Sequence, residues 1–152
     1  MEGRIRDILS GVRYATALVV TGLLGAVAVA AAQTPANRTV WDGVYSDDQA
    51  KRGLDVYKDR CISCHMESLD GGGVAASLVG DDFMGDWTGK SVGELFRNTM
   101  LTMPADDPGG LKPEQLVDCL AYIFSKNKFP SGQTELPSDV EALKLIRIQP
   151  QK

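Results

Sequence analysis

Histidine is nearly absent from this sequence. Among the 152 residues it occurs once, at position 65. A single imidazole excludes every site that needs two, such as zinc proteases with an HExxH motif and haem proteins with two histidine ligands. Cysteine is also scarce, because three residues are too few, and odd in number, for a disulfide framework. Few side chains therefore remain to carry metal or redox chemistry.

An excess of positive charge is also missing. The chain has 16 Lys and Arg against 20 Asp and Glu, a formal net charge of −4. This balance argues against nucleic-acid binding, which depends on many cationic contacts to phosphates. Hydrophobic residues at 43% and charged residues at 24% are ordinary for a globular protein. The length suits one modest domain with a tail.

Charge is absent from residues 14–32, which are dominated by Ala, Val, Leu and Gly. The preceding residues 1–13 carry three arginines, and the apolar run closes with three alanines before Gln33. This pattern predicts a secretory signal peptide over 1–32, cleaved after Ala32. An uncleaved membrane anchor is the alternative, since the run approaches the length that spans a bilayer. Both alternatives export the remainder, so a periplasmic location is expected.

The exported part divides into three segments. Residues 33–45 read as a linker, 46–130 as one domain, and 131–152 as a C-terminal extension. Capping boxes at Ser46 and Ser91 predict helices that run to about residues 59 and 99. No strand alternation and no internal repeat stand out.

Two further helices are predicted toward the C-terminus. One begins near Lys112 with Pro113 in its first turn and ends before Pro130, and a short one begins near Ser138. Glycine-rich connections separate the helices, above all the long stretch from residue 66 to 90. The fold class predicted is therefore all-α: a small, loop-rich domain of three to five short helices.

The long connections point to a bound group. Short helices with such loops exclude water poorly by themselves, whereas loops of this length are usually functional or disordered. A large, flat, apolar group wrapped by the loops would resolve this difficulty. Cys61-x-x-Cys64-His65 is the attachment sequence of such a group, haem c. Two thiols at this spacing reach the two vinyl groups of one porphyrin, and His65 then offers a nitrogen to the iron.

Three other interpretations use the same residues. Cys61 and Cys64 could form a plain disulfide, or a thioredoxin-like redox pair, although the latter requires a βαβ context that is not visible. A zinc site would use both cysteines with His65 and Cys119, but adjacent Cys64 and His65 are awkward donors for one tetrahedron. Export, spacing and loop content together favour one covalent haem with its iron.

A methionine is the candidate for the sixth iron ligand, because no second imidazole exists. Met66 abuts His65 and cannot cross to the opposite face, while Met84 and Met100 suit core packing. Met103 precedes Pro104, and a residue before proline is driven out of helical geometry into an extended backbone. We therefore predict iron ligation by His65 and Met103.

These motifs together resemble the class I cytochromes c. The resemblance runs from Gly53-x-x-x-Tyr57 through the attachment sequence and Met103-Pro104 to Tyr122, and covers nearly all of the exported domain. It implies that the first and last helices of the domain cross at Gly53, a residue that costs about 1 kcal/mol inside a helix. It also implies that Cys119 occupies an interfacial leucine position, as a buried core thiol and not a ligand.

Other details follow from the same resemblance. Trp87 is a candidate donor to a haem propionate or a packing residue at the haem edge, and Pro104 accompanies Met103 in the haem pocket. The family's proline in the turn after the attachment sequence is replaced by Ala76, whose carbonyl can still accept the other N–H of His65. Asp106 and Asp107 are interpreted as turn residues.

The function expected is one-electron transport, not enzymatic catalysis. The stretch 103–111 is similar to small monohaem cytochromes associated with PQQ-dependent dehydrogenases, which implies such a dehydrogenase as donor and an oxidase or another cytochrome as acceptor. The alternatives are a haem enzyme or gas sensor with a labile sixth ligand, and a fixed subunit of a dehydrogenase complex anchored by residues 14–32. The extension 131–152 is either a partner contact or a brace over the domain.

Overall fold

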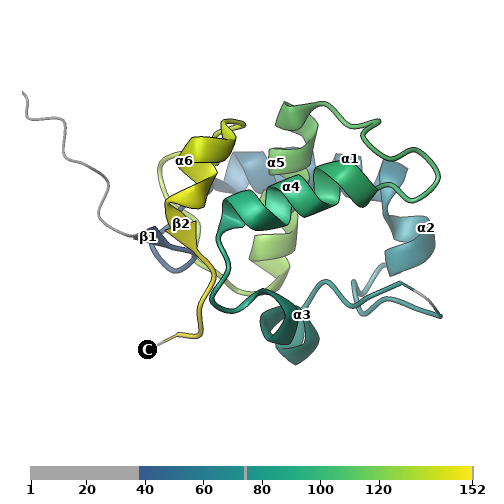
Figure 1. Cartoon of the computed structure of the whole chain (residues 1–152), viewed down its shortest axis with the longest axis horizontal. Coiled ribbons are helices and arrows are strands. Elements are labelled where there is room, and N and C mark those ends of the chain that lie inside the picture. Colours follow the sequence, from purple (N-terminus) through teal and green to yellow (C-terminus); the bar gives the residue numbers. More distant parts are fainter. Residues whose placement is uncertain (1–37, 74, 152) are drawn as a thin grey trace, which may run out of the picture. The chain divides into compact units, whose positions relative to one another are not determined.

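The computed structural model describes residues 38–73 and 75–151. In this part of the chain the order of elements is β1 (Arg38–Thr39), α1 (Asp47–Arg60), α2 (Ile62–His65), α3 (Gly80–Trp87), α4 (Val92–Thr102), α5 (Pro113–Lys126), α6 (Val140–Lys144) and β2 (Ile146–Arg147) (Figure 1). Helices dominate and the strands are two residues each. The predicted all-α fold class is confirmed, with six helices described instead of three to five.

The predicted helix starts are confirmed by their caps. Ser46 Oγ accepts a hydrogen bond from the Gln49 amide, and Ser91 and Glu94 form a reciprocal capping box. Pro113 occupies the first turn of α5, where its missing N–H has no partner to lose. The ends differ by a few residues: α4 continues to Thr102, and α5 stops at Lys126.

Helix α3 lies inside the stretch predicted to be a loop, so that prediction was wrong for residues 80–87. The helix begins at a glycine, and its N-cap residue Val79 makes no side-chain capping bond. Only Phe83 is buried, which leaves no apolar repeat for a sequence pattern to detect. Asp81 and Asp82 in the first turn favour the helix through its dipole.

Helices α1 and α5 cross at Gly53, as the resemblance implied. A Cβ atom on Gly53 would overlap the backbone carbonyl of Asp118 and lie 3.0 Å from Tyr122 Cβ. The rings of Tyr57 and Tyr122 pack beside this point with centroids 5.2 Å apart. Cys119 lies in the same interface with 3% of its surface exposed, which agrees with a core thiol.

The predicted linker 33–45 is structured over the part that the structure describes, residues 38–45. Val40, Val44 and Tyr45 are buried in the hydrophobic core. Strand β1 pairs in parallel with β2, and Trp41 Nε1 donates to the carbonyl of Gln149 at 2.7 Å. A linker was expected because Pro and Gly interrupt this segment, but its apolar residues find partners far away in the sequence.

The C-terminal extension packs on the domain as a brace. Leu143, Ile146 and Ile148 are buried, and α6 contacts α4 (Figure 1). The backbone of Ile148 exchanges hydrogen bonds of 2.9 Å with Lys90 and Gly89, just before α4 begins. Of the two alternatives for residues 131–152, the described residues therefore show the bracing contacts.

The predicted signal peptide, 1–32, lies outside the described residues. Within the described stretches, none of the helices combines the length and the apolar character needed to span a bilayer.

We expect Gly53→Ala to destabilise the haem-loaded protein by about 1 to 3 kcal/mol, because the added methyl group forces α1 and α5 apart. The free energy of unfolding in denaturant measures this effect. Gly85→Ala in α3 is the matched control, since a Cβ there meets nothing within 4 Å. The control should be neutral or stabilising by up to about 1 kcal/mol. Equal stability of the two variants would contradict the close crossing.

Candidate haem-binding site

The attachment sequence forms a single helical turn at the end of α1. Cys61 caps α1, donating its backbone N–H to Tyr57 O at 2.9 Å, and it also precedes the four residues of α2. The amides of Cys64 and His65 both donate to Cys61 O, at 3.2 and 3.0 Å. The turn brings Cys61, Cys64 and His65 together, which is the arrangement that attachment of one porphyrin requires.

The exposure of these side chains suits the same role. Cys64 is exposed, Cys61 is partly buried, and both thiols are free. His65 is 8% exposed, which makes it one of the few buried polar residues described. Tyr57 OH donates to Met66 O at 2.6 Å and so fixes the end of the turn against α1.

The imidazole of His65 is oriented by a backbone carbonyl. Its Nδ1 lies 2.8 Å from Ala76 O. A carbonyl oxygen can only accept, so Nδ1 carries the proton and Nε2 keeps its lone pair. The hydrogen bond fixes both the tautomer and the ring orientation, as partners of metal-bound imidazoles do. The residues present therefore fit an axial ligand to iron, and replacement of the family's proline by Ala76 leaves the bond in place.

The loop that presents Ala76 is held at several points. Gly71 has φ +74°, and a Cβ there would overlap the backbone of Ala75. The Gly71 amide donates to His65 O at 3.2 Å, and Leu78 N donates to the carbonyl of buried Leu69 at 2.8 Å. These bonds keep the loop close to α2.

Asn127 is a positioning residue that the sequence patterns did not indicate. From the end of α5, its Nδ2 donates to Leu78 O at 2.9 Å and its Oδ1 accepts from Gly80 N at 3.1 Å. The side chain thereby joins α5 to the loop that carries Ala76. An asparagine just after a helix is common enough as a terminator that no sequence signal separates this role from an ordinary one.

Met103 has the extended backbone that the following proline predicted. It ends α4 with φ −127° and ψ 151°, and its amide donates to Thr99 O at 2.8 Å. The side chain is 36% exposed, whereas Pro104 is buried. Met84 and Met100 pack against the core, in agreement with their predicted filling role, and Met66 is 46% exposed.

Trp87 lies at the end of α3, partly buried against the core. Lys90 Nζ lies 4.7 Å from the centre of its ring. Its indole N–H donates to none of the described residues' polar groups. Both interpretations of Trp87, a donor to a haem propionate and a packing residue, are compatible with this placement.

The third cysteine lies next to the first. Cys119 Sγ is 3.9 Å from Cys61 Sγ. The hydrogen bond to Cys61 and burial raise the pKa of the Cys119 thiol, and the same contact lowers the pKa of Cys61. The nucleophilic thiolate is therefore favoured on Cys61, the attachment residue, and disfavoured on Cys119. No group of three or more His, Cys, Asp or Glu in residues 38–73 and 75–151 is placed to hold a metal ion, so the zinc alternative finds no support.

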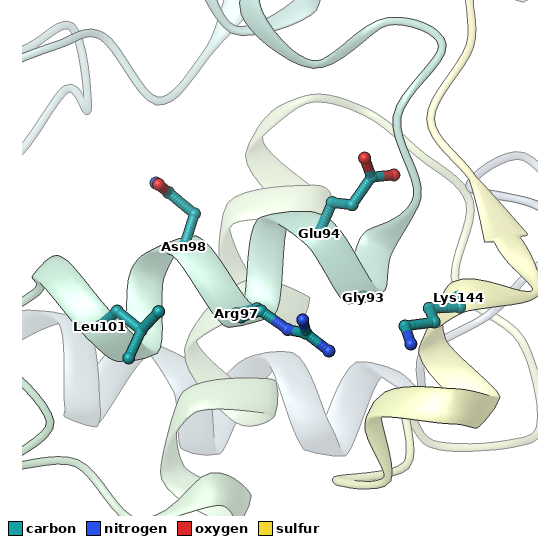
Figure 2. A pocket seen from close by; sticks show the side chains of 6 residues that line it. All are labelled: Gly93, Glu94, Arg97, Asn98, Leu101 and Lys144. Atoms are coloured by element: carbon teal, nitrogen blue, oxygen red, sulfur yellow. The ribbon is translucent and has the colours of Figure 1, made fainter.

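A hollow of about 290 Å³ between α4 and α6 is separate from these residues (Figure 2). Its lining consists of Gly93, Glu94, Arg97, Asn98, Leu101 and Lys144. None of the predicted haem-binding residues contributes to it, so it is not the haem site. Arg97 points into it from the exposed face of α4.

The chain matches a known protein family. The family model described as cytochrome c oxidase, cbb3-type, subunit III matches residues 48–123, from the first turn of α1 into α5. This range contains the attachment sequence and Met103. No curated protein and no solved structure matches the chain. Domains of this kind are typically exported, and they transfer electrons through haem. The chain belongs to this family and is a class I c-type cytochrome with one covalently bound haem c.

Proposed function

We propose that the chain is a periplasmic one-electron carrier in which His65 and Met103 are the axial iron ligands. The observation that carries the proposal is the hydrogen bond from His65 Nδ1 to Ala76 O at 2.8 Å. It leaves Nε2 as the only nitrogen in the chain able to act as an imidazole ligand, because the sequence has no other histidine. Bound haem supplies one-electron exchange at the porphyrin edge.

The chain's own residues then have separate roles. Cys61 and Cys64 would tether the group through thioether bonds, and His65 and Met103 would ligate its iron. Two protein ligands leave no coordination position for a substrate, which favours electron transfer over catalysis. A thioether on one face stabilises the ferrous state and raises the reduction potential relative to a second imidazole. Pro104 and Trp87 would lie beside the group.

The proposed partners are a donor dehydrogenase of the quinoprotein type and an acceptor that is an oxidase or another cytochrome. The similarity of residues 103–111 to cytochromes of PQQ-dependent dehydrogenases supports the donor. Cleavage after Ala32 would remove three arginines and two acids and change the net charge from −4 to −5. Such a charge favours docking to a basic partner surface.

A fixed subunit of a respiratory complex is the second candidate. The matching family is described as subunit III of a cbb3-type oxidase. The uncharged run 14–32 would then serve as an uncleaved anchor. Co-purification from detergent-solubilised membranes distinguishes the two: a carrier is recovered alone from the soluble fraction, and a subunit is recovered with other chains.

We expect ferric and ferrous spectra of the purified haem-loaded protein to be low-spin, and the ferrous spectrum to be unchanged by carbon monoxide. In the proposed site His65 and Met103 would hold both axial positions, so carbon monoxide would find no open position on the iron. Optical spectroscopy with and without carbon monoxide measures this. A carbon monoxide shift would instead support the alternative of a gas sensor or haem enzyme with an open iron.

Met103→Ala should convert the iron to a form that binds carbon monoxide and should lower the reduction potential, because the thioether is lost. Spectra and potentiometry of the variant measure both changes. Met66→Ala is the matched control, since it removes a more exposed methionine directly after His65. An unchanged ferric spectrum in Met103→Ala would contradict the assignment of Met103 as the sixth iron ligand.

The net negative charge should make electron transfer depend on salt. Oxidation of the ferrous protein by a cationic cobalt complex should slow as ionic strength rises, whereas oxidation by anionic ferricyanide should speed up. Stopped-flow rates across a salt series measure this. Rates independent of salt with both oxidants would contradict electrostatic docking.

A further inference from the structure

One ion pair joins the two segments of chain that carry the proposed ligands. Arg60 is the last residue of α1 and stands directly before Cys61. Its Nη2 donates to Asp107 Oδ2 at 2.6 Å. Asp107 is four residues beyond Met103, and the two partners are 47 residues apart in the sequence. The sequence analysis treated Asp107 as a turn residue, but its carboxylate reaches across to the attachment segment.

The loop around Asp107 is shaped to present this carboxylate. Two successive turns meet there, since Asp107 N donates to Pro104 O at 3.0 Å and Gly110 N donates to Asp107 O at 2.9 Å. Gly110 has no side chain where a Cβ would overlap the Asp107 carboxylate. A larger residue at position 110 would require the Asp107 carboxylate to shift from this position.

The ends of the loop are fixed independently of its middle. Met103 N is bonded to Thr99 O at the end of α4, and Leu111 is buried at the start of the segment that leads into α5. Between these two points, residues 105–110 are exposed. The contact with Arg60 holds this exposed stretch to the end of α1. Asp107 also raises the pKa of the Arg60 guanidinium through the same hydrogen bond.

We propose that the Arg60–Asp107 pair is a positioning clamp that holds the 103–111 loop against the attachment segment and so keeps Met103 on the iron. The inference rests on the proposed function, in which Met103 is the sixth ligand. An added ligand can replace Met103 only when the loop moves away. An interaction that exists only in the closed loop lowers the population of the open form and therefore weakens the apparent affinity for that ligand.

The pair is partly exposed, with 31% of the Arg60 side chain and 55% of the Asp107 side chain accessible. Ion pairs in such positions shift an equilibrium modestly, so loss of the clamp should increase the open population roughly two- to five-fold. The effect is smaller than that of losing Met103 itself. It is nevertheless measurable as the affinity of a competing ligand.

Imidazole is a suitable probe because its neutral form carries no charge. It should bind the ferric, haem-loaded protein of Asp107→Asn roughly two- to five-fold more tightly than the wild type. The loss of the sulfur-to-iron charge-transfer band reports displacement of Met103 during the titration. Asp106→Asn is the matched control, since it removes the same charge one residue away and forms no ion pair within the described stretches. Its imidazole affinity should match the wild type.

A double-mutant cycle separates the clamp from a simple charge or turn effect. Arg60→Gln should raise the imidazole affinity as Asp107→Asn does. The double variant should bind imidazole about as tightly as either single variant, because each substitution alone already breaks the ion pair. If the two effects add, or if Asp107→Asn behaves like Asp106→Asn, the clamp is overturned. A wild type without the sulfur-to-iron band would overturn the proposed function instead. High salt provides a second readout: it should raise the imidazole affinity of the wild type but not that of the double variant.

Discussion

The hydrogen bond from His65 to the carbonyl of Ala76 is the interaction on which the site depends. The chain has one imidazole, so its tautomer and orientation decide whether a nitrogen is available to iron. A backbone carbonyl performs this task only if the loop that carries it is rigid. The bonds of Gly71 to His65, and of Asn127 to the loop and α3, supply that rigidity without the family's proline. Much of the irregular segment between α2 and α3 is therefore part of the site.

The crossing of α1 and α5 links this site to the rest of the fold. Gly53 lets the two helices approach at one point, and one turn beyond it Tyr57 reaches both Tyr122 and the carbonyl of Met66. The attachment cysteines follow directly where α1 ends. A change in the crossing therefore moves Cys61 and the turn that holds His65. Helix α1 therefore fixes the position of the site relative to the core.

Local signals in the sequence were sufficient to predict part of this structure. Side chains within three residues of a helix start cap it, so Ser46 and Ser91 mark their helices, and proline imposes its geometry on Met103 from the next position. Interactions between distant residues leave no such pattern. Helix α3, the clamp between Arg60 and Asp107, and the bonds of Asn127 all depend on partners that only the folded chain brings close. The same holds for residues 38–45, whose sequence is typical of a linker but whose partners lie at the other end of the described chain.

The parallel pairing of β1 with β2 also constrains the order in which the domain can form. Trp41 and Gln149 are 108 residues apart, and a ribosome or a translocation channel delivers the chain from its N-terminal end. The β1–β2 pair can therefore form only after the C-terminal brace has emerged.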